Sequence, residues 1–321
     1  MRFSDHRAAS AQAGAAVAFD RLIGRAGSPE QGDTLIVVAG IHGNEPAGVI
    51  AAQRVYSVLA SRDLDLKGEL VLLAGNTRAL AQRQRFLERD LNRGWTTARL
   101  DRLRHQPIDP ELHPEDSEQL ELLEQIEPVL ARARGKVYFL DLHTTSSDGY
   151  PFGMILDGAP QRLFAYHFPV PILLGILDQI DSVLLRYMHA RGCVSVGIEG
   201  GQNETPHSID HHVAILWLGL TAAGLLPLHQ VPDTGLHRAL LTRATYGCPR
   251  ILQVVHRHAI RPEDEFKMLP GFANIQRVKR GELLAHDRYG EIRAREDGVI
   301  CLPLYQAQGD DGFFFGRELQ P

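Results

Sequence analysis

The stretch DTLIVVAGIHGNEPAGVI (residues 33–50) decides the fold of this chain. DTLIVVAG (33–40) is a short apolar run that ends in glycine, which is typical of a buried strand. PAGVIAAQRVYSVLA (46–60) follows with the pattern of a helix and with Pro46 in its first turn. This part of the chain is therefore predicted to form a strand, a glycine-rich loop and a helix.

The same alternation continues beyond this stretch. Further strands are expected at ELVLLAGN (69–76), KVYFLDLHT (136–144), GYPFGMIL (149–156), VPILLGIL (170–177) and CVSVGIEGG (193–201). Helices are expected over 116–134 and from about 208 to 225. Strands that alternate with helices predict an α/β fold with a mixed, centrally parallel sheet flanked by helices on both faces.

The chain changes character after VPDTG (231–235). From there on, short β-like runs are separated by Gly and Asp turns, and no long helix is expected. We therefore predict a catalytic domain over residues 1–232 and a smaller β-rich C-terminal domain over 233–321.

Composition limits the class of protein. The formal net charge of −5 gives no global attraction to nucleic acid or to an anionic membrane, so neither is expected as a partner. The apolar run at 214–228 contains Gly, Thr and Pro and favours a buried helix over a membrane span. Three widely spaced cysteines argue against a disulfide framework, and residues 1–20 lack the pattern of a signal peptide. We expect a cytoplasmic protein and leave homo-oligomer formation open.

The first candidate functional motif is GIHGNEPAG (40–48), between the first strand and its helix. Ligands of open α/β sheets gather at the carboxyl ends of strands, where this loop lies. His42 and Glu45 are three residues apart across a Gly-Asn turn and can converge on one point. A Gly-rich turn with a polar helix start is the alternative.

A second and a third group also end predicted strands. In FLDLHTTSS (139–147), His143 can supply a third metal ligand, with Asp141 as a partner that orients an imidazole. Two His and one Glu with an open fourth position are typical of catalytic zinc. In VGIEGGQ (196–202), Glu199 can act as a general base. The alternative for Asp141 and His143 is an interior Asp-His pair that binds no metal. The alternative for Glu199 is a strand-end Glu in a surface salt bridge.

A fourth group is basic. GNTRAL (75–80) and RFLERDLNRGW (85–95) place Arg78, Asn92 and Arg93 at predicted strand or loop ends. The planar guanidinium group suits bidentate binding of a carboxylate, and an arginine near a metal can stabilise an oxyanion. A solvated basic helix face is the alternative, and we favour it for Arg83 and Arg89, while the role of Arg85 stays open.

Five motifs occur here in one order, namely GIHGNEPAG, GNTRA, DLNR, DLHTTS and VGIEGG. In this order they resemble the aspartoacylase and succinylglutamate desuccinylase family, a branch of the metallocarboxypeptidase superfamily. The resemblance covers about residues 35–202 and implies one Zn²⁺ per chain, held by His42, Glu45 and His143. It also implies Glu199 as the general base, Arg78 as the group that polarises the scissile carbonyl, and Asn92 with Arg93 as the anchor of a substrate carboxylate.

One departure from the family pattern concerns a second substrate carboxylate. The resemblance implies that members acting on N-acetylaspartate carry a further arginine about ten residues before the base, whereas this chain has His189 there. We expect hydrolysis of the amide bond of a small N-acyl amino acid or a similar small amide. The alternatives are a metallocarboxypeptidase acting on peptide C-termini and a binding protein that has lost catalysis.

Overall fold

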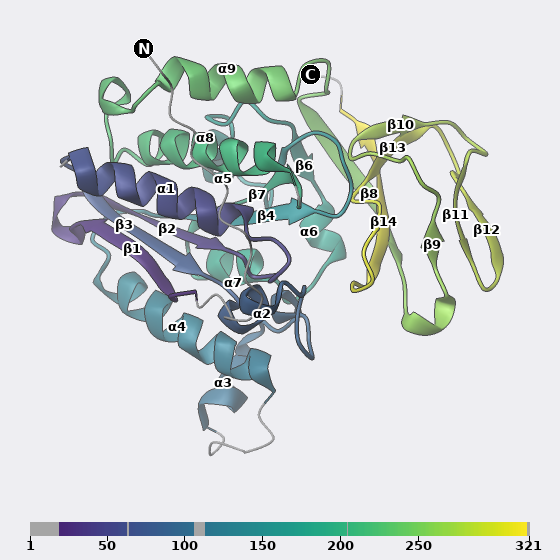
Figure 1. Cartoon of the computed structure of the whole chain (residues 1–321), viewed down its shortest axis with the longest axis horizontal. Coiled ribbons are helices and arrows are strands. Elements are labelled where there is room, and N and C mark those ends of the chain that lie inside the picture. Colours follow the sequence, from purple (N-terminus) through teal and green to yellow (C-terminus); the bar gives the residue numbers. More distant parts are fainter. Residues whose placement is uncertain (1–18, 63, 106–112, 204, 320–321) are drawn as a thin grey trace, which may run out of the picture.

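The protein was analysed as a computed structural model, which describes residues 19–62, 64–105, 113–203 and 205–319 (Figure 1). The expectation about the N-terminal stretch falls mostly on residues 1–18, which lie outside the described residues.

Strands and helices alternate over most of the chain. Their order is β1 (Leu22–Gly27), η1 (Pro29–Gln31), β2 (Asp33–Ala39), α1 (Ala47–Arg62), β3 (Gly68–Ala74), α2 (Thr77–Gln82), η2 (Leu91–Arg93), α3 (Thr97–His105), α4 (Pro114–Arg132), β4 (Val137–Thr145), β5 (Phe152–Met154), α5 (Ala159–Ala165), β6 (Ile172–Leu174), α6 (Ile176–Gln179), α7 (Leu184–Ala190), β7 (Val194–Gln202), α8 (Pro206–Ala222), η3 (Leu228–Gln230), α9 (Thr234–Ala244), β8 (Ile251–Ala259), η4 (Pro262–Asp264), β9 (Lys267–Met268), β10 (Gln276–Val278), β11 (Leu283–Asp287), β12 (Gly290–Arg293), β13 (Gly298–Cys301) and β14 (Asp311–Glu318).

Within the described residues, the large sheet has the strand order β1-β3-β2-β4-β7-β5-β6-β8-β14-β13-β10. Its centre is parallel, because β3, β2, β4 and β7 run in one direction. Strand β5 then pairs antiparallel with β7, and β1 pairs antiparallel with β3. The predicted mixed, centrally parallel α/β sheet is confirmed.

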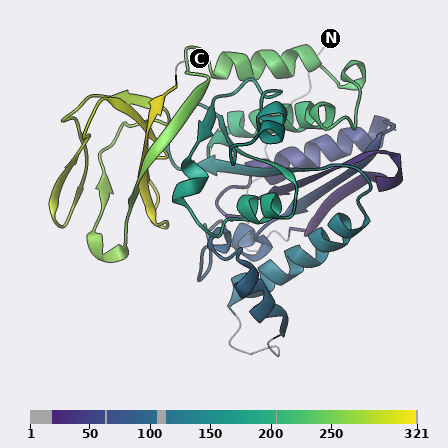
Figure 2. The same ribbon diagram turned by 180° about the vertical axis from the view of Figure 1, so that it is seen from behind.

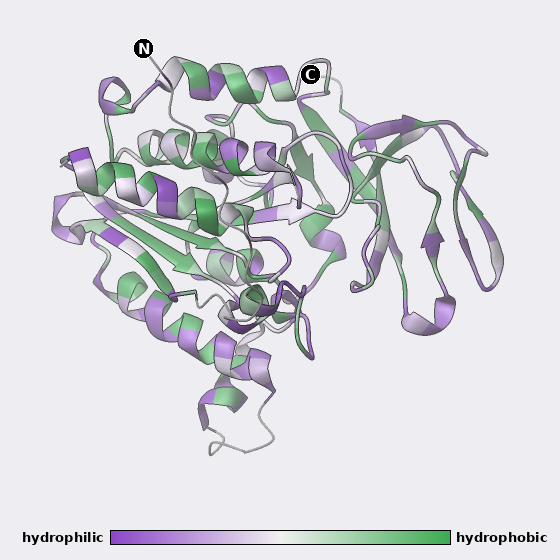
Figure 3. Ribbon diagram, in the orientation of Figure 1, coloured by the Kyte–Doolittle hydropathy of each residue, from purple (hydrophilic) through white to green (hydrophobic). Residues whose placement is uncertain are grey.

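Two apolar cores lie on the two faces of this sheet, since successive residues of a strand point to opposite sides. Leu35 and Val37 belong to the core beneath α1 and α8, whereas Ile36 and Val38 belong to the core beneath α4 and α7. Figures 1 and 2 show α1, α8 and α9 on one side of the sheet and α4 on the other. The central strands are hydrophobic along most of their length, while the helices carry both kinds of residue (Figure 3). This explains why strands buried on both faces appear as continuous apolar runs in the sequence.

Two of the predicted strands are shorter than expected. Strand β5 covers only three residues of the predicted range 149–156. In the range 170–177, strand β6 ends before Gly175, whose φ of 77° turns the chain into the short helix α6. An apolar run alone does not reveal such a turn, because strand and buried helix share the same composition.

The C-terminal part differs from expectation at its start. Residues 234–244 form helix α9, so the expectation that no long helix follows residue 233 is wrong. The buried Leu241 packs α9 into the core next to α8. The β-rich part begins at β8, which pairs parallel with β6 and antiparallel with β14 and so extends the large sheet. The boundary of the two domains at 232/233 stays a prediction.

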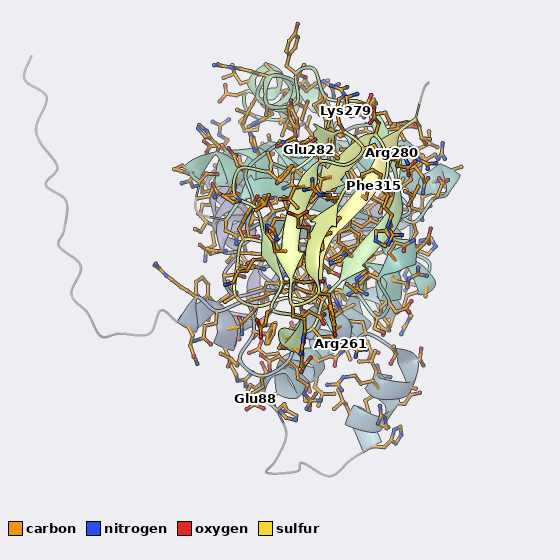
Figure 4. All side chains as sticks on the ribbon, turned by 90° about the vertical axis from the view of Figure 1, so that its right-hand side faces the viewer. Glu88, Arg261, Lys279, Arg280, Glu282 and Phe315 are labelled. Carbon is orange, nitrogen blue, oxygen red and sulfur yellow. The ribbon has the colours of Figure 1, made fainter. Side chains whose placement is uncertain are left out.

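Strands β14, β13 and β10 follow β8 in the sheet, and β12, β11 and β9 form a second, three-stranded sheet among the described residues. Figure 4 looks onto this region, with Phe315 of β14 between Lys279 and Arg280 toward one end and Arg261 toward the other. Glu88, which comes from a loop of the first half of the chain, lies toward the end marked by Arg261.

Two composition-based expectations concern the whole chain. The cysteines Cys193, Cys248 and Cys301 are free, as expected. In the part of the chain that the structure describes, none of the helices combines the length and the apolar character that a membrane span requires.

Candidate metal centre and active site

The candidate site lies at the carboxyl ends of three neighbouring parallel strands. His42 and Glu45 lie in the loop that follows β2, His143 lies near the end of β4, and Glu199 lies near the end of β7. In the β4–β7 ladder, His143 is directly opposite Glu199. Parallel strands thus bring residues that are about 50 to 100 positions apart to one edge of the sheet.

A buried carboxylate lies between two buried imidazoles. Nδ1 of His42 lies 2.8 Å from Oε1 of Glu45, and Nδ1 of His143 lies 3.1 Å from Oε2 of Glu45. Burial alone would raise the pKa of the Glu45 carboxyl, but His42 and His143 outweigh it and hold that pKa below its ordinary value. The two rings therefore keep Glu45 ionised within the protein interior.

The second nitrogen of each ring faces another carboxylate. Nε2 of His42 lies 3.2 Å from Oδ1 of Asp90, and Nε2 of His143 lies 3.2 Å from Oδ1 of Asp141. Partners of this kind fix the tautomer and the orientation of a metal-binding imidazole, which leaves both Nδ1 atoms for a ligand. The role suggested for Asp141 by its place in the strand agrees with this contact.

These residues fit a metal ion by the chemistry of their donors. Among the described residues, His42, Glu45 and His143 offer one ligand atom each, and these atoms lie within 4.8 Å of one another. Two imidazole nitrogens and one carboxylate oxygen, all buried, form a donor set that suits Zn²⁺ and leaves a coordination position for a substrate.

The loop that carries this group depends on a close approach of the backbone at Gly43. A Cβ atom built at Gly43 would lie 2.0 Å from the backbone carbon of Ala79 and 2.4 Å from the carbonyl oxygen of Gln84. No side chain fits there without a shift of the backbone. Gly43 thereby lets the 40–45 loop pack against the segment that leads to Asp90.

Glu199 has the features of a group prepared to handle a proton. Its side chain is buried, and among the described residues its Oε2 atom has no hydrogen-bond partner. Burial raises the pKa of the Glu199 carboxyl to about 7, against the opposing effect of His143. A carboxyl group with such a pKa can both accept and release a proton near neutral pH.

A cavity of about 120 Å³ joins these groups. His42, Glu45, His143 and Glu199 all contribute to its lining. Its apolar wall is formed by Met154, Ile176, Leu177, Ile180, Val183, Leu185 and Phe314. Residues 302–311, which join β13 to β14 and which we call the rim segment, contribute Leu302, Pro303, Leu304, Gln306, Gly309, Asp310 and Asp311.

Residues 31–168 match the family described as "Succinylglutamate desuccinylase/Aspartoacylase catalytic domain". This part of the chain is therefore similar to the catalytic domain of the succinylglutamate desuccinylase and aspartoacylase family. Over 67 residues it is 39% identical to the succinylglutamate desuccinylase of Pseudomonas paraeruginosa, which covers 21% of this chain and 20% of that protein.

Solved structures extend the likeness over most of the chain. A succinylglutamate desuccinylase/aspartoacylase from Rhodobacter sphaeroides superposes with a TM-score of 0.63 at 21% identity, covering 92% of this chain and 86% of that chain. A succinylglutamate desuccinylase from Vibrio parahaemolyticus gives 0.61 at 18% identity, covering 91% and 83%. At these identities the likeness shows the shared fold of the desuccinylase and aspartoacylase family alone.

Arg78 is not part of the cavity lining, although the sequence analysis placed it at the scissile carbonyl. Its Nη1 donates to Glu118 at 2.7 Å and its Nη2 to Glu121 at 2.7 Å, both on α4. Arg85 lines the cavity instead and donates to Oε1 of Glu45 at 3.3 Å and to Oδ2 of Asp90 at 3.1 Å. Arg78 lies in the first turn of α2 beside α4, whereas α2 ends at the left-handed residue Arg83 and the chain turns before Arg85.

Asn92 and Arg93 both line the cavity, but their polar groups are largely engaged. Oδ1 of Asn92 accepts a hydrogen bond of 2.8 Å from the backbone N–H of Leu184. Nη2 of Arg93 donates to Asp310 at 3.1 Å and to Asp311 at 2.7 Å. Both predicted anchors thus line the cavity, and the charge of Arg93 is compensated by Asp310 and Asp311 of the rim segment.

Two buried residues that the sequence analysis did not single out support the site. Nε2 of His212, on α8, lies 2.9 Å from the carbonyl oxygen of His143. Glu115, on α4, accepts hydrogen bonds of 2.7, 3.2 and 3.2 Å from the backbone N–H groups of residues 87–89. The sequence analysis began this helix at residue 116, so it included neither Glu115 nor the backbone groups that Glu115 binds.

Glu115 is expected to hold the loop that supplies Arg85 and Asp90. Glu115→Ala removes the acceptor of three partly buried N–H groups, and we expect it to lower the free energy of unfolding in urea by about 2–3 kcal/mol. Glu121→Ala is the matched control on the same helix. Its side chain is partly exposed, so a loss below about 1 kcal/mol is expected. Equal losses in the two variants would contradict this role of Glu115.

Proposed function

We propose that this chain is a zinc-dependent hydrolase that cleaves the amide bond of a small N-acyl amino acid or a related small amide. The observation that carries the proposal is the buried set His42, Glu45 and His143 with the unpartnered carboxylate of Glu199 beside it. Relatives named succinylglutamate desuccinylase, and a structural neighbour named murine aminoacylase 3, support the reaction class.

His42, Glu45 and His143 would hold the ion. Zn²⁺, when bound, supplies Lewis-acid activation of water and of the amide carbonyl. Asp90 and Asp141 hold the two imidazoles in place through their Nε2 atoms.

Glu199 is the general base in this proposal. Its unpartnered Oε2 accepts a proton from the attacking water and then delivers that proton to the leaving nitrogen. Arg85, rather than Arg78, donates to the oxygen that becomes negative when the carbonyl is attacked, because it is the arginine next to Glu45. Asn92 keeps its NH2 group available to orient the substrate, since its Oδ1 is bound to Leu184.

The cavity favours a small amide over a peptide. Its volume of about 120 Å³ is below the roughly 300–1,000 Å³ of common ligand pockets. A metallocarboxypeptidase also needs a cation free to bind the C-terminal carboxylate, and Arg93 is paired with two aspartates. A cytoplasmic location and the two-domain division remain part of the proposal.

A substrate panel tests the proposal directly. Metal-reconstituted protein is incubated with acetyl-, succinyl- and other acyl-amino acids and with short peptides, and release of the free amine is measured. We expect cleavage of at least one acyl-amino compound, loss of activity with a chelator, and recovery with Zn²⁺. Faster release of C-terminal residues from peptides would favour the carboxypeptidase. Absence of zinc, with ligand binding unaffected by chelator, would favour a binding protein.

Glu199→Gln tests the general base. The substitution keeps the shape of the side chain but removes its basicity, so kcat is expected to fall on the order of 10²–10⁴-fold. Zinc content by metal analysis is expected to stay at the wild-type value, because Glu199 is not a member of the ligand set. Near-normal turnover with zinc still bound would rule out this mechanism.

A pair of arginine variants tests which guanidinium group serves the reaction. Arg85→Gln is expected to lower kcat on the order of 10²-fold through loss of an oxyanion donor. Arg78→Gln, which removes ion pairs with Glu118 and Glu121 on α4, is expected to keep turnover within about twofold of wild type, since Arg78 does not line the cavity. The reverse order of effects, at equal zinc content, would restore the role first expected for Arg78.

A further inference from the structure

The charges that line the cavity are unbalanced. In the part of the chain that the structure describes, two arginines, Arg85 and Arg93, and five carboxylate side chains line it. The carboxylates are Glu45, Asp141, Glu199, Asp310 and Asp311. A bound divalent ion adds two positive charges, and the lining then still carries no excess of positive charge. An anionic substrate would therefore find no net attraction here.

Both terminal nitrogens of the Arg93 guanidinium group already donate hydrogen bonds to residues that the structure describes. Its Nη1 donates to the carbonyl oxygen of Asn92 at 3.1 Å, and its Nη2 donates to Asp310 and Asp311. Its Nε is buried and has no partner among the described residues. A substrate carboxylate would have to displace an aspartate to form the two parallel hydrogen bonds that make an arginine a strong carboxylate anchor.

The two aspartates are themselves held by a second arginine. Arg257, on β8, donates to Asp310 at 2.9 Å and also contacts Asp311. The four groups form a closed set of two cations and two anions, which we call the rim ion cluster. Because each charge has its partner within the cluster, opening it for a ligand costs ion pairs on both sides.

Other contacts fix the rim segment over the cavity. Asn44 donates to Gln306 at 2.8 Å, Gln308 donates to the carbonyl oxygen of Phe86 at 3.1 Å, and the backbone N–H of Tyr305 donates to Ser146 at 3.0 Å. The rim segment is therefore hydrogen-bonded to the three loops that carry Asn44, Phe86 and Ser146. Its position does not depend on Arg93 alone.

Among the described residues that line the cavity, Arg85 is the other arginine, and it is paired with Glu45 and Asp90. The rest of the cavity wall is largely apolar, and His189 shares a hydrogen bond with Gln161 and is not part of the cavity lining. An apolar wall beside a neutralised arginine suits an uncharged group or a cationic one.

We infer that Asp311, with Asp310, determines specificity by occupying Arg93, so that the preferred substrates are amides whose amine half carries no net negative charge. This inference rests on the proposed amide hydrolysis and narrows its substrate class. Asp311 acts in it as an internal carboxylate at the position where acidic substrates would bind. Amides of acidic amino acids are the poorest substrates.

Matched compounds test the inference on the zinc-loaded protein. N-acetyl-L-leucine and N-acetyl-L-leucinamide differ in the charge of the amine half, and N-acetyl-L-aspartate adds a second carboxylate. We expect kcat/KM to fall about tenfold from the carboxamide to the free acid and further to the aspartate compound, because a carboxylate finds no free charged donor. A free acid cleaved as well as its carboxamide would overturn the inference.

Variants of the rim segment test the role of each aspartate. Asp311→Asn frees one side of Arg93. We expect it to raise the ratio of kcat/KM for N-acetyl-L-leucine to kcat/KM for N-acetyl-L-leucinamide about tenfold, mainly through a lower KM for the free acid. Asp310→Asn, whose side chain is about half exposed, is expected to shift it less. The control Asp297→Asn removes an exposed partner of Lys279 far from the cavity and is expected to keep the wild-type ratio. A wild-type ratio in both rim variants would overturn the inference.

Ligand binding separates this inference from the proposed reaction. The Tm of the zinc-loaded wild type is measured with L-leucinamide and with L-leucine, the two amine halves, at equal concentrations. We expect L-leucinamide to raise Tm more than L-leucine does, whichever acyl group the enzyme accepts. This preference without cleavage of any amide would refute the proposed function and keep the charge selectivity. Equal rises, or none, would refute the selectivity.

Discussion

The carboxylate of Glu45 between the imidazoles of His42 and His143 is the constraint on which the rest of the site depends. A buried carboxylate is tolerated only with partners that compensate its charge, and here the two rings do so. Each ring then needs an acceptor for its other nitrogen, which Asp90 and Asp141 supply. Asp90 is in turn paired with Arg85. The centre is therefore a continuous series of polar contacts that runs from Arg85 through Asp90, His42, Glu45 and His143 to Asp141.

The need to hold these contacts in place accounts for buried polar residues outside the set of His42, Glu45 and His143. Glu115 is placed in the interior to bind three successive N–H groups of the loop that carries Asp90. His212 contacts the backbone of His143 from α8, and Gly200 leaves room for its ring, since a Cβ atom at Gly200 would lie only 2.5 Å from Nε2 of His212. Polar networks of this kind hold a site rigid only when every member has its partner.

The C-terminal strands take part in the site rather than standing beside it. Strand β8 continues the large sheet next to β6, and the rim segment between β13 and β14 closes the cavity opposite the metal group. The cavity thus combines residues at the ends of the central strands with a segment that comes from the other end of the chain. The pairing of Arg93 with Asp310 and Asp311 joins these two parts.

The sequence by itself determined the α/β class, the central strands, and the place of His42, Glu45, His143 and Glu199 at strand ends. These follow from local patterns, because an apolar run buried on both faces and the residues at its end are read from neighbouring positions. It did not reveal helix α9, which was taken as the start of a β-rich region although Leu241 packs it against the core.

Only the tertiary structure decided which arginines line the cavity. Arg78 and Arg85 are seven residues apart and both basic, but Arg78 contacts α4 at the start of α2, whereas Arg85 follows the left-handed turn at Arg83 and lies in the cavity lining. Arg93 meets aspartates more than 200 positions away in the chain. Side-chain partners at such separations depend on how loops cross, and the spacing of residues along one sequence carries no information about that.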